Sequence, residues 1–484
     1  MKISACSRTN GPITATVSNW RLGSFRQWLA TTMTATAMLL GGCAGIASLP
    51  ANRLLVENAL VFPMDPARPA PFIGYLLVAS DGTIARVGEG RPAADLRAAR
   101  RIDAQGQWLL PGFVSAHSHL WQSDFAGIAS DQNLEGWMAQ LYGKVTPGLD
   151  AAQLYRLTRL GAEHHLLNGI TTAFNFTVTG GDKTGRVDRC QLLAATHSGM
   201  RVLHGFNVRK IDAQWTPEDA KERLRAFLQW AGEQRGSGRY LGTVIAGAGM
   251  YYDDPAQTRT EAGLMQAFGL DNQQHYLEAP GLVSAERARY RWLKEFGVVG
   301  PKLVYGHFVH PTPDMVFEAA QAGAGMSWNP LSNGRLGSGT PDIPAYRAQG
   351  LRIGMGVDGE ASADRADPFE NMRAGLYQIR ANRQSASVLS AFDVLRMHTL
   401  GSAEVLGVDG VVGSLAEGKK ADFLLVDAKG FQPYKDPYAA LVFAAGVENI
   451  NGVFVDGEQV AAQRRLAGVA ATPDAAPCDA GKQP

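Results

Sequence analysis

The middle of the chain alternates short apolar runs with stretches that have helical patterning. Several of the helix-like stretches, such as AAQLYRLTRLGAEHHLLNG and PEDAKERLRAFLQWAGEQ, follow Thr, Ser, Asp or Pro, which are common at helix starts. The apolar runs have the length of buried strands. They are LLPGFVSAH, ITTAFNFT, MRVLHGFN, LGTVIAGAGM, QQHYLEA, KLVYGHFV, AGMSWNP and LRIGMGVD. Strand and helix units repeated in this way predict an α/β fold, a (β/α)8 TIM barrel over residues 109–404.

Two β-rich segments flank this alternating region. RLLVENALVF, IGYLLVASDGTIARVGEG and ARRIDAQGQWLLPG precede it, and KKADFLLVDAKG and LVFAAGVENINGVFVDG follow it. Their short strand patterns are separated by Asp-Gly and other turn residues. We expect residues 51–108 and 405–465 to form one small β-sandwich domain from both chain ends, followed by a flexible tail over 466–484.

The charge balance and the cysteine spacing limit the possible partners, disulfides and metal sites. The 46 basic and 45 acidic residues give a net charge of +1, with no long block of like charge. This balance argues against nucleic acid as a partner, so we expect a small-molecule substrate and a homo-oligomer, most simply a dimer. No two of the 4 cysteines have the Cys-x-x-Cys spacing, so we expect neither a disulfide framework nor a cysteine zinc site.

The N-terminal region has the pattern of an export signal. Basic residues between positions 2 and 26 precede the apolar run WLATTMTATAMLL, which is too short to span a bilayer but suits a signal peptide. The following LGGC resembles a lipobox, in which Cys43 would be lipidated. Residues 1–50 are therefore predicted to be a signal peptide and linker of a periplasmic or outer-membrane lipoprotein. The long polar segment at the start of the chain leaves two alternatives open. The region could be a mobile N-terminal helix instead of a signal peptide, and the protein would then be cytoplasmic.

The first apolar run ends in two histidines. Because side chains alternate along a strand, His117 and His119 point to the same face and can bind one ion. Two histidines on a buried strand need a partner, and a metal ion supplies one.

Further polar residues end the later strands of the barrel. His275 and Glu278 are three apart, so they can meet only if the strand ends and the chain turns over the barrel mouth. Glu278 would then move protons between water and a leaving group. Asp358 ends the Gly-rich eighth strand and is either a metal ligand or an ordinary turn residue. His307 is a further ligand or a hydrogen-bonding electrophile.

The loops after the strands should form the substrate pocket, with aromatic faces for a planar ring and amides for its edges. Each candidate could equally be a core residue. The candidates are Trp121, Gln122, Trp137, Asn175, Asn207, Tyr251, Asn329 and Asn333. The shortage of Arg and Lys at the predicted strand ends argues against strongly anionic substrates.

Several segments together resemble the metal-dependent amidohydrolase superfamily. They are LPGFVSAHSHLWQS, HYLEAP, VYGHFVHP, NPLSNGRLGSGTPDIPAYRAQGLRIGMGVDG, DPFENMRAGL and GSLAEGKKADFLLVD, and the resemblance covers about residues 53–460. Within the superfamily the chain is similar to the branch of cytosine and guanine deaminases and triazine hydrolases.

The resemblance implies roles for the strand-end residues. The metal ligands would be His117, His119, His275 and Asp358. Glu278 would match the proton-shuttling glutamate, His307 the sixth-strand histidine, and Asp358 would also accept a proton from water. The fourth strand, LGTVIAGAGM, lacks the lysine of two-metal members, so we expect one divalent ion, Zn²⁺ or alternatively Fe²⁺.

The expected function is hydrolysis of carbon–nitrogen bonds, other than peptide bonds, by a metal-activated water. Deamination, or release of an amine, amide or urea, from a small heterocyclic or aryl substrate would fit. The segment GEASADRADPFENMR lacks the Ser-Asn-Asn run of the nucleoside deaminases and leans toward the triazine hydrolases. There are two alternatives: an enzyme that removes chlorine from a triazine, and an exported barrel protein that binds a ligand or metal without catalysis. A non-haem iron oxygenase is a poorer match, because it uses two histidines and one carboxylate rather than four ligands.

Overall fold

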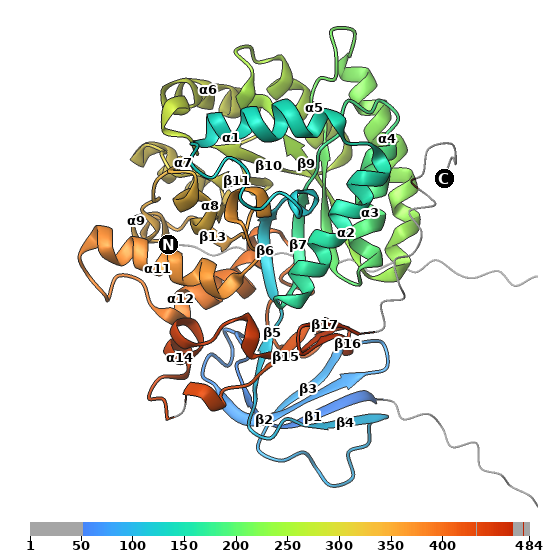
Figure 1. The fold of residues 1–484 in the computed structure, drawn as a ribbon, viewed down its shortest axis with the longest axis vertical. Helices are drawn as coiled ribbons and strands as arrows, with labels where there is room; N and C mark the ends of the chain where they lie inside the picture. The colour runs from blue at the N-terminus through green and yellow to red at the C-terminus, as the bar shows by residue number, and fades with distance from the viewer. Residues whose placement is uncertain (1–51, 432, 468–477, 479–484) are drawn as a thin grey trace, which may run out of the picture. The chain divides into compact units, whose positions relative to one another are not determined.

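A parallel barrel occupies the middle of the chain, and a β-sheet built from both chain ends lies beneath it (Figure 1). The computed structural model describes residues 52–431, 433–467 and 478, which all belong to one unit, Leu49–Pro484. The proposed export signal and Cys43 lie outside the described residues. The predicted α/β barrel with a small β domain is confirmed.

The barrel strands follow one another in sequence order, and each pairs in parallel with the next. Every run that the sequence predicted to be a strand overlaps one of them. They are β6 (Phe113–Ser118), β7 (Ile170–Phe176), β8 (Arg201–Asn207), β9 (Tyr240–Gly247), β10 (Asp271–Tyr276), β11 (Leu303–His307), β12 (Gly325–Trp328) and β13 (Arg352–Met355).

The first and last strands meet through residues just beyond their ends. Ser118 and Asp358 form a parallel bridge. The Asp358 N–H donates to the His117 carbonyl (3.0 Å), and the His119 N–H donates to the Asp358 carbonyl (3.3 Å). These bonds join β6 to the segment after β13 and complete the ring of strands.

Helices surround the barrel, and several begin at side-chain caps. Asp150 and Thr216 each form a capping box, which satisfies amide groups that a helix start leaves free. The larger helices are α2 (Ala151–Leu167), α3 (Arg186–His197), α4 (Pro217–Glu233), α5 (Ala256–Phe268), α6 (Val283–Glu295), α7 (Pro313–Gln321) and α11 (Pro368–Arg383). The shorter ones are α1 (Leu134–Gln140), α8 (Pro330–Arg335), α9 (Ile343–Ala348), α10 (Glu360–Ala363), α12 (Ala391–Arg396), α13 (Ser402–Val405) and α14 (Pro437–Ala444).

The small domain is one nine-stranded sheet. Its strands are β1 (Asn52–Val61), β2 (Phe72–Ala79), β3 (Ile84–Glu89), β4 (Arg100–Asp103), β5 (Trp108–Pro111), β14 (Phe423–Val426), β15 (Ile450–Val455), β16 (Glu458–Ala462) and β17 (Arg465–Leu466). β5 pairs with both β1 and β14, so it joins the two chain ends. The sequence predicted that the first part of the small domain ends at residue 108 and that the barrel begins at residue 109. This boundary falls within β5, and the first barrel strand begins at Phe113.

A buried ion pair joins the sheet to the barrel. Arg201, the first residue of β8, contacts Asp422 (2.7 Å) and Asp456 (2.6 Å) of the sheet domain. Because Arg201 lies at the amino end of a barrel strand, the sheet covers the bottom of the barrel and leaves the carboxyl ends of the strands for a site.

One finding contradicts the cysteine prediction. Cys190 of α3 and Cys478 form a disulfide. They are separated by 288 positions in sequence, so no local spacing could have indicated the pair. Separately, no helix in the described part of the chain has the length and apolar character needed to cross a membrane.

A candidate metal centre at the barrel mouth

The two histidines that end β6 present the same nitrogen to the barrel axis. His117 Nδ1 lies 2.5 Å from the side-chain oxygen of Gln273, and His119 Nδ1 lies 3.1 Å from the carbonyl oxygen of Phe176. Because these oxygens only accept hydrogen bonds, each Nδ1 carries the proton. Each Nε2 therefore keeps a lone pair, as a metal ligand requires.

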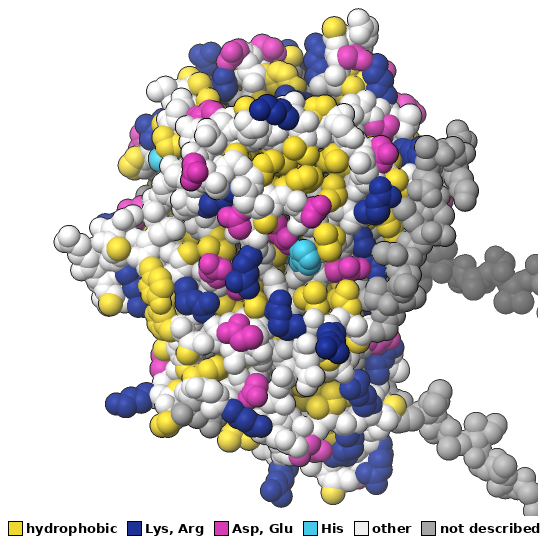
Figure 2. Space-filling model, in the orientation of Figure 1, with side chains coloured by type: hydrophobic (Ala, Val, Ile, Leu, Met, Phe, Trp, Pro, Cys, Tyr) yellow, Lys and Arg dark blue, Asp and Glu magenta, His cyan; other side chains and the backbone are white. Residues whose placement is uncertain are grey.

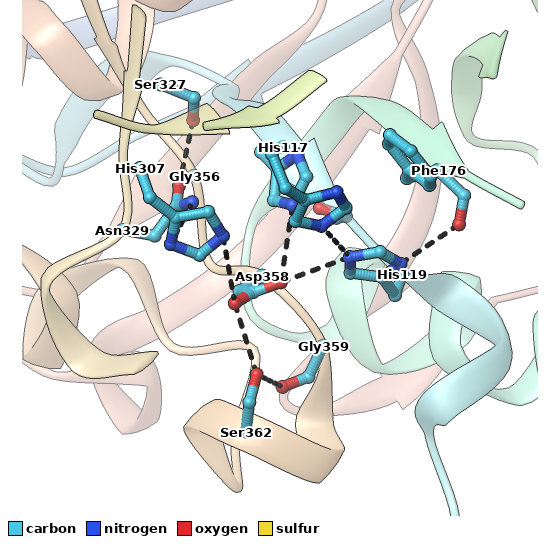
Figure 3. Close-up of polar contacts among 12 residues, drawn as sticks. His117, His119, Phe176, His307, Ser327, Asn329, Gly356, Asp358, Gly359 and Ser362 are labelled. Carbon is cyan, nitrogen blue, oxygen red and sulfur yellow. Dashed lines mark hydrogen bonds and ion pairs between the residues drawn. The ribbon is translucent and has the colours of Figure 1, made fainter. Parts of the chain in front are cut away.

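Four side chains from three strand ends meet at this point (Figure 3). His119 Nε2 lies 3.1 Å from His275 Nε2, and Asp358 Oδ1 lies 3.4 Å from the Nε2 atoms of both His117 and His119. The ligand atoms of His117, His119 and His275 all lie within 4.8 Å of one another. The structure thus brings together the four residues that the sequence predicted as ligands.

The protonation states of these groups fit a cation. Burial lowers the pKa of His119 to about 3 and that of His275 well below its ordinary value, so both rings are neutral. Burial opposes ionisation of Asp358, but His117 and the neighbouring imidazoles hold its pKa well below its ordinary value. His117 Nε2 is buried without a hydrogen-bond partner. Neutral imidazoles and one carboxylate form a donor set that suits Zn²⁺ or Fe²⁺.

Glu278 lies over this cluster because the chain turns immediately after β10. Leu277 has a left-handed backbone (φ 53°), and the turn brings Glu278 Oε1 to 3.4 Å from His307 Nδ1. Burial, with Asp358 nearby, raises the pKa of Glu278 well above its ordinary value. This shift favours the protonated form of Glu278, which is the form that can donate a proton to a leaving atom.

His307 ends β11 and is oriented by two amides. Asn333 and Asn329 place their Nδ2 atoms 2.8 and 3.3 Å from His307 Nδ1. Amide N–H groups donate, so Nδ1 accepts and the proton lies on Nε2, which is 3.8 Å from Asp358 Oδ2. Although His307, His117 and Asp358 are close enough to hold an ion, this tautomer makes His307 a hydrogen-bond donor.

A cavity of about 380 Å³ opens from the cluster toward solvent. It includes His119, His275, Glu278, His307 and Asp358, and its outer wall comes from α1 and the π-helical turn Leu141–Val145. On the face drawn in Figure 2, hydrophobic side chains gather over the barrel, beside the position of α1 in Figure 1. Apolar and aromatic residues dominate the wall: Leu134, Trp137, Met138, Tyr142, Phe176, Val178, Tyr251 and Leu336.

Three of the predicted pocket residues, Trp137, Asn207 and Tyr251, line the cavity. Five do not, which corrects the prediction: Trp121, Gln122, Asn175, Asn329 and Asn333.

These five residues lie behind the wall, where each has another partner. Trp121 is fully buried in a cluster with Trp137 and Leu141, and the Gln122 amide faces Tyr142. The Asn175 side chain accepts from the Leu120 amide (3.0 Å). Asn329 and Asn333 orient His307, as described above.

Sequence reasoning missed Arg209, Tyr142 and Phe176 in the cavity wall and Gln273 behind His117. The position of Arg209 two residues after a barrel strand was the one available signal. Tyr142 comes from a loop that folds back over the mouth, and its contribution depends on that fold.

Comparison with known proteins agrees with this arrangement. The amidohydrolase family profile matches residues 108–460. The chain is 30% identical to a 5-methylthioadenosine/S-adenosylhomocysteine deaminase of Symbiobacterium thermophilum, over 84% of this chain and 93% of that protein. It is 28% identical to a 5'-deoxyadenosine deaminase of Methanosarcina mazei, over 84% of this chain and 92% of that protein.

Solved structures show the same fold. An adenosine deaminase from Xanthomonas campestris with bound zinc superposes with a TM-score of 0.78 at 24% identity, covering 87% of this chain and 95% of that one. An atrazine chlorohydrolase from Arthrobacter aurescens complexed with zinc superposes with a TM-score of 0.76 at 21% identity, covering 86% of this chain and 96% of that one.

Proposed function

The chain belongs to the amidohydrolase family and hydrolyses carbon–nitrogen bonds, and from this premise we propose that it releases ammonia or an amine from a planar heteroaromatic or aryl substrate. The observation that carries the proposal is the buried Glu278 carboxyl, whose Oε1 lies 3.4 Å from His307 Nδ1 beside the ligand cluster. A nitrogen leaving group departs readily only when it is protonated, and Glu278 is placed to supply that proton.

We propose a single Zn²⁺ ion, held by His117, His119, His275 and Asp358, with Fe²⁺ compatible with the same donors. When bound, such an ion supplies the Lewis acidity that activates water at neutral pH. A single ion is supported by the absence of lysine from β9 and by the tautomer of His307, which directs a proton rather than a lone pair toward Asp358.

The side chains divide the proton transfers between them. Asp358 Oδ2, which accepts from Ser362 Oγ (3.1 Å), can take a proton from the attacking water. The His307 Nε2–H can donate to the oxygen that gains negative charge. Glu278 delivers a proton to the departing nitrogen and can later recover one from Asp358.

The cavity wall favours a flat ring without a sugar. Trp137, Tyr142, Phe176 and Tyr251 offer aromatic faces. Among the lining residues the only carboxylates are Glu278 and Asp358, and both belong to the proton-transfer site. No further carboxylate therefore lines the cavity to accept from a ribose diol, so we favour a free heterocycle or aryl amide over a nucleoside.

Dechlorination of a triazine is the second candidate, because the same ligands and cavity could serve it. Chloride leaves without being protonated, so in that reaction Glu278 would have only a ring nitrogen to protonate. The named deaminase relatives favour the nitrogen leaving group.

The test is a release assay on the metal-loaded protein, with ammonia, amine and chloride measured for purines, pyrimidines, triazines, pterins, ureas and aryl amides. We expect ammonia or amine release, and we expect Glu278→Gln to retain the metal but lose about 10²- to 10⁴-fold in turnover. Full turnover by Glu278→Gln would contradict the proton-delivery role. Chloride release without release of ammonia or an amine would establish the second candidate.

We also propose that the protein is an exported lipoprotein anchored through Cys43 and that it forms a homodimer. The Cys190–Cys478 disulfide supports export, because disulfides persist mainly in oxidising compartments. Mass spectrometry of the membrane fraction should find Cys43 as an acylated N-terminal residue; an unprocessed N-terminus in the soluble fraction would refute the anchor. Light scattering tests the dimer.

A further inference from the structure

The charges in the cavity wall differ between its inner and outer ends. Glu278 and Asp358 lie at the inner end with the metal ligands. Arg209 is the only lysine or arginine among the lining residues. It belongs to the loop after β8, where its backbone N–H donates to the Asn207 side chain (2.9 Å). A single cation thus faces the cavity, on a loop at the barrel mouth.

Arg209, unlike Lys183 and Arg223, has no acidic partner among the described residues. Lys183 pairs with Asp212 and Arg223 with Asp188, whereas no carboxylate of the described chain lies within 4.0 Å of the Arg209 guanidinium. Its Nε–H donates to the hydroxyl of Tyr252 (3.2 Å), and its guanidinium carbon lies 5.9 Å from the Tyr252 ring centre. Tyr252 therefore fixes the side chain without neutralising it.

The charge of Arg209 reaches the aromatic wall. Burial and then Asp358 raise the pKa of Tyr142, and Arg209 acts against that rise. At Tyr251, where burial, Tyr142 and Glu278 raise the pKa, Arg209 again acts in the opposite direction. Arg209, Tyr142 and Tyr251 line the same cavity, so a ligand that lies against these rings has the guanidinium on the same wall.

We propose that the substrate carries one carboxylate on its planar aromatic body, and that this carboxylate pairs with Arg209 while the opposite end of the substrate reaches Glu278. This inference rests on the proposed function. A guanidinium binds a carboxylate through two parallel hydrogen bonds. One cation matches one negative charge, whereas a phosphate dianion would call for more.

The same arrangement orients the substrate. Arg209 would attract an anionic group to the outer end of the cavity. An acid bound in the cavity would therefore present its neutral, nitrogen-bearing end to the catalytic groups. A single carboxylate is compatible with the expectation, drawn from the scarcity of basic residues at strand ends, that strongly anionic substrates are disfavoured.

Binding of indole acids to the metal-loaded protein tests the proposal. Indole-3-acetate, indole-3-propionate and indole-3-butyrate vary the distance from ring to carboxylate, and the corresponding alcohols are neutral controls. Affinities can be measured by isothermal titration calorimetry, because the indole ligands share the fluorescence of tryptophan. We expect at least one acid to bind about 10- to 100-fold more tightly than its alcohol, as hydrogen bonds to charged groups allow.

Arg209→Gln should remove this preference and leave the affinity for the alcohols unchanged. Arg209→Glu should favour tryptamine over the acids. Lys210→Gln is the matched control, because Lys210 is the neighbouring exposed cation and does not line the cavity. We expect it to behave like the wild type.

If Arg209→Gln kept the wild-type ratio of acid affinity to alcohol affinity, the proposal would be overturned. The carboxylate would then bind the metal or another group. An equal loss in Lys210→Gln, or the failure of every acid to bind at millimolar concentration, would also overturn the proposal. Failure of the proposed function would give a different result. The preference for acids would still depend on Arg209, but no substrate in the release assay would yield ammonia or an amine.

Discussion

At the scale of single residues, the ligand cluster depends on an amide that cannot touch the ion. Gln273 is fully buried on β10, two positions before His275. Its Nε2 donates to the Ala116 carbonyl (2.9 Å), which turns its oxygen toward His117 Nδ1. Gln273 thereby fixes both the tautomer of His117 and the direction of its free lone pair.

Replacing Gln273 should therefore weaken metal binding without removing a ligand. We expect Gln273→Leu to lower the affinity for Zn²⁺ about 10- to 100-fold, as is typical when the hydrogen-bond partner of a ligand histidine is lost. Competition with a chelator measures this. Gln273→Glu keeps an acceptor for His117 and should recover much of the affinity; equal affinities for all three proteins would show that Gln273 has no such role.

At the scale of elements, the turn that carries Glu278 is held by the first turns of α6 and by the end of β11. Glu286 of α6 accepts from the Leu277 amide, and the Tyr276 hydroxyl donates to the Glu286 carbonyl (2.7 Å). The Leu277 carbonyl accepts from the amides of Val309 and His310 (both 3.0 Å). The second carboxyl oxygen of Glu286 has no hydrogen-bond partner among the described residues, and burial raises the pKa of Glu286 to about 8.

This raised pKa makes Glu286 a source of pH-dependent instability. Below about pH 4.5 the carboxyl is protonated in both the folded and the unfolded chain, so it has no effect. Between about 4.5 and about 8 the unfolded chain releases the proton and the folded chain keeps it, so the free energy of unfolding falls as pH rises.

We therefore expect Glu286→Gln to be more stable than the wild type at neutral pH, with a difference that grows from pH 5 to 8 and then stays constant. Urea unfolding across pH 5–9 measures it. Glu295→Gln, at an exposed position of the same helix, is the control and should show no such trend. A difference independent of pH would mean that Glu286 is ionised in the folded protein.

The elements themselves could be predicted from the sequence, and much of the ligand cluster with them. Apolar runs bounded by polar residues predicted β6 to β13, and histidines at the ends of such runs pointed to one site. The spacing of His275 and Glu278 required a turn, which the structure places at Leu277. The pocket wall was less predictable, because the sequence does not distinguish an asparagine that lines the cavity, as Asn207 does, from one that orients a histidine, as Asn333 does.

At the scale of the whole molecule, the disulfide ties a residue close to the C-terminus to a barrel helix. Cys478 lies in a buried cluster with Tyr155, Cys190 and Ala194. A covalent link between residues 288 positions apart closes a long loop in the unfolded chain, which reduces its entropy.

We expect Cys190→Ser to lower the free energy of unfolding by about 2 to 4 kcal/mol. Denaturant unfolding of the oxidised protein measures the loss. Cys478→Ser should lose the same amount and the double variant no more, since one bond is lost in each case. Wild-type protein with a reductant should match the variants; an unaltered midpoint in all of them would mean that the bond contributes nothing to stability.

The ring of strands closes where the metal ligands lie, and this has a thermodynamic consequence. The amide and carbonyl of Asp358 bond to the backbone of His117 and His119, while the side chains of the same residues form the ion site. Separation of β6 from the end of β13 would pull the ligands apart. Any ion that binds only the closed ring therefore adds its binding free energy to the cost of opening it. Metal supply to the cell would then determine how long the chain survives proteases as well as how fast it turns over.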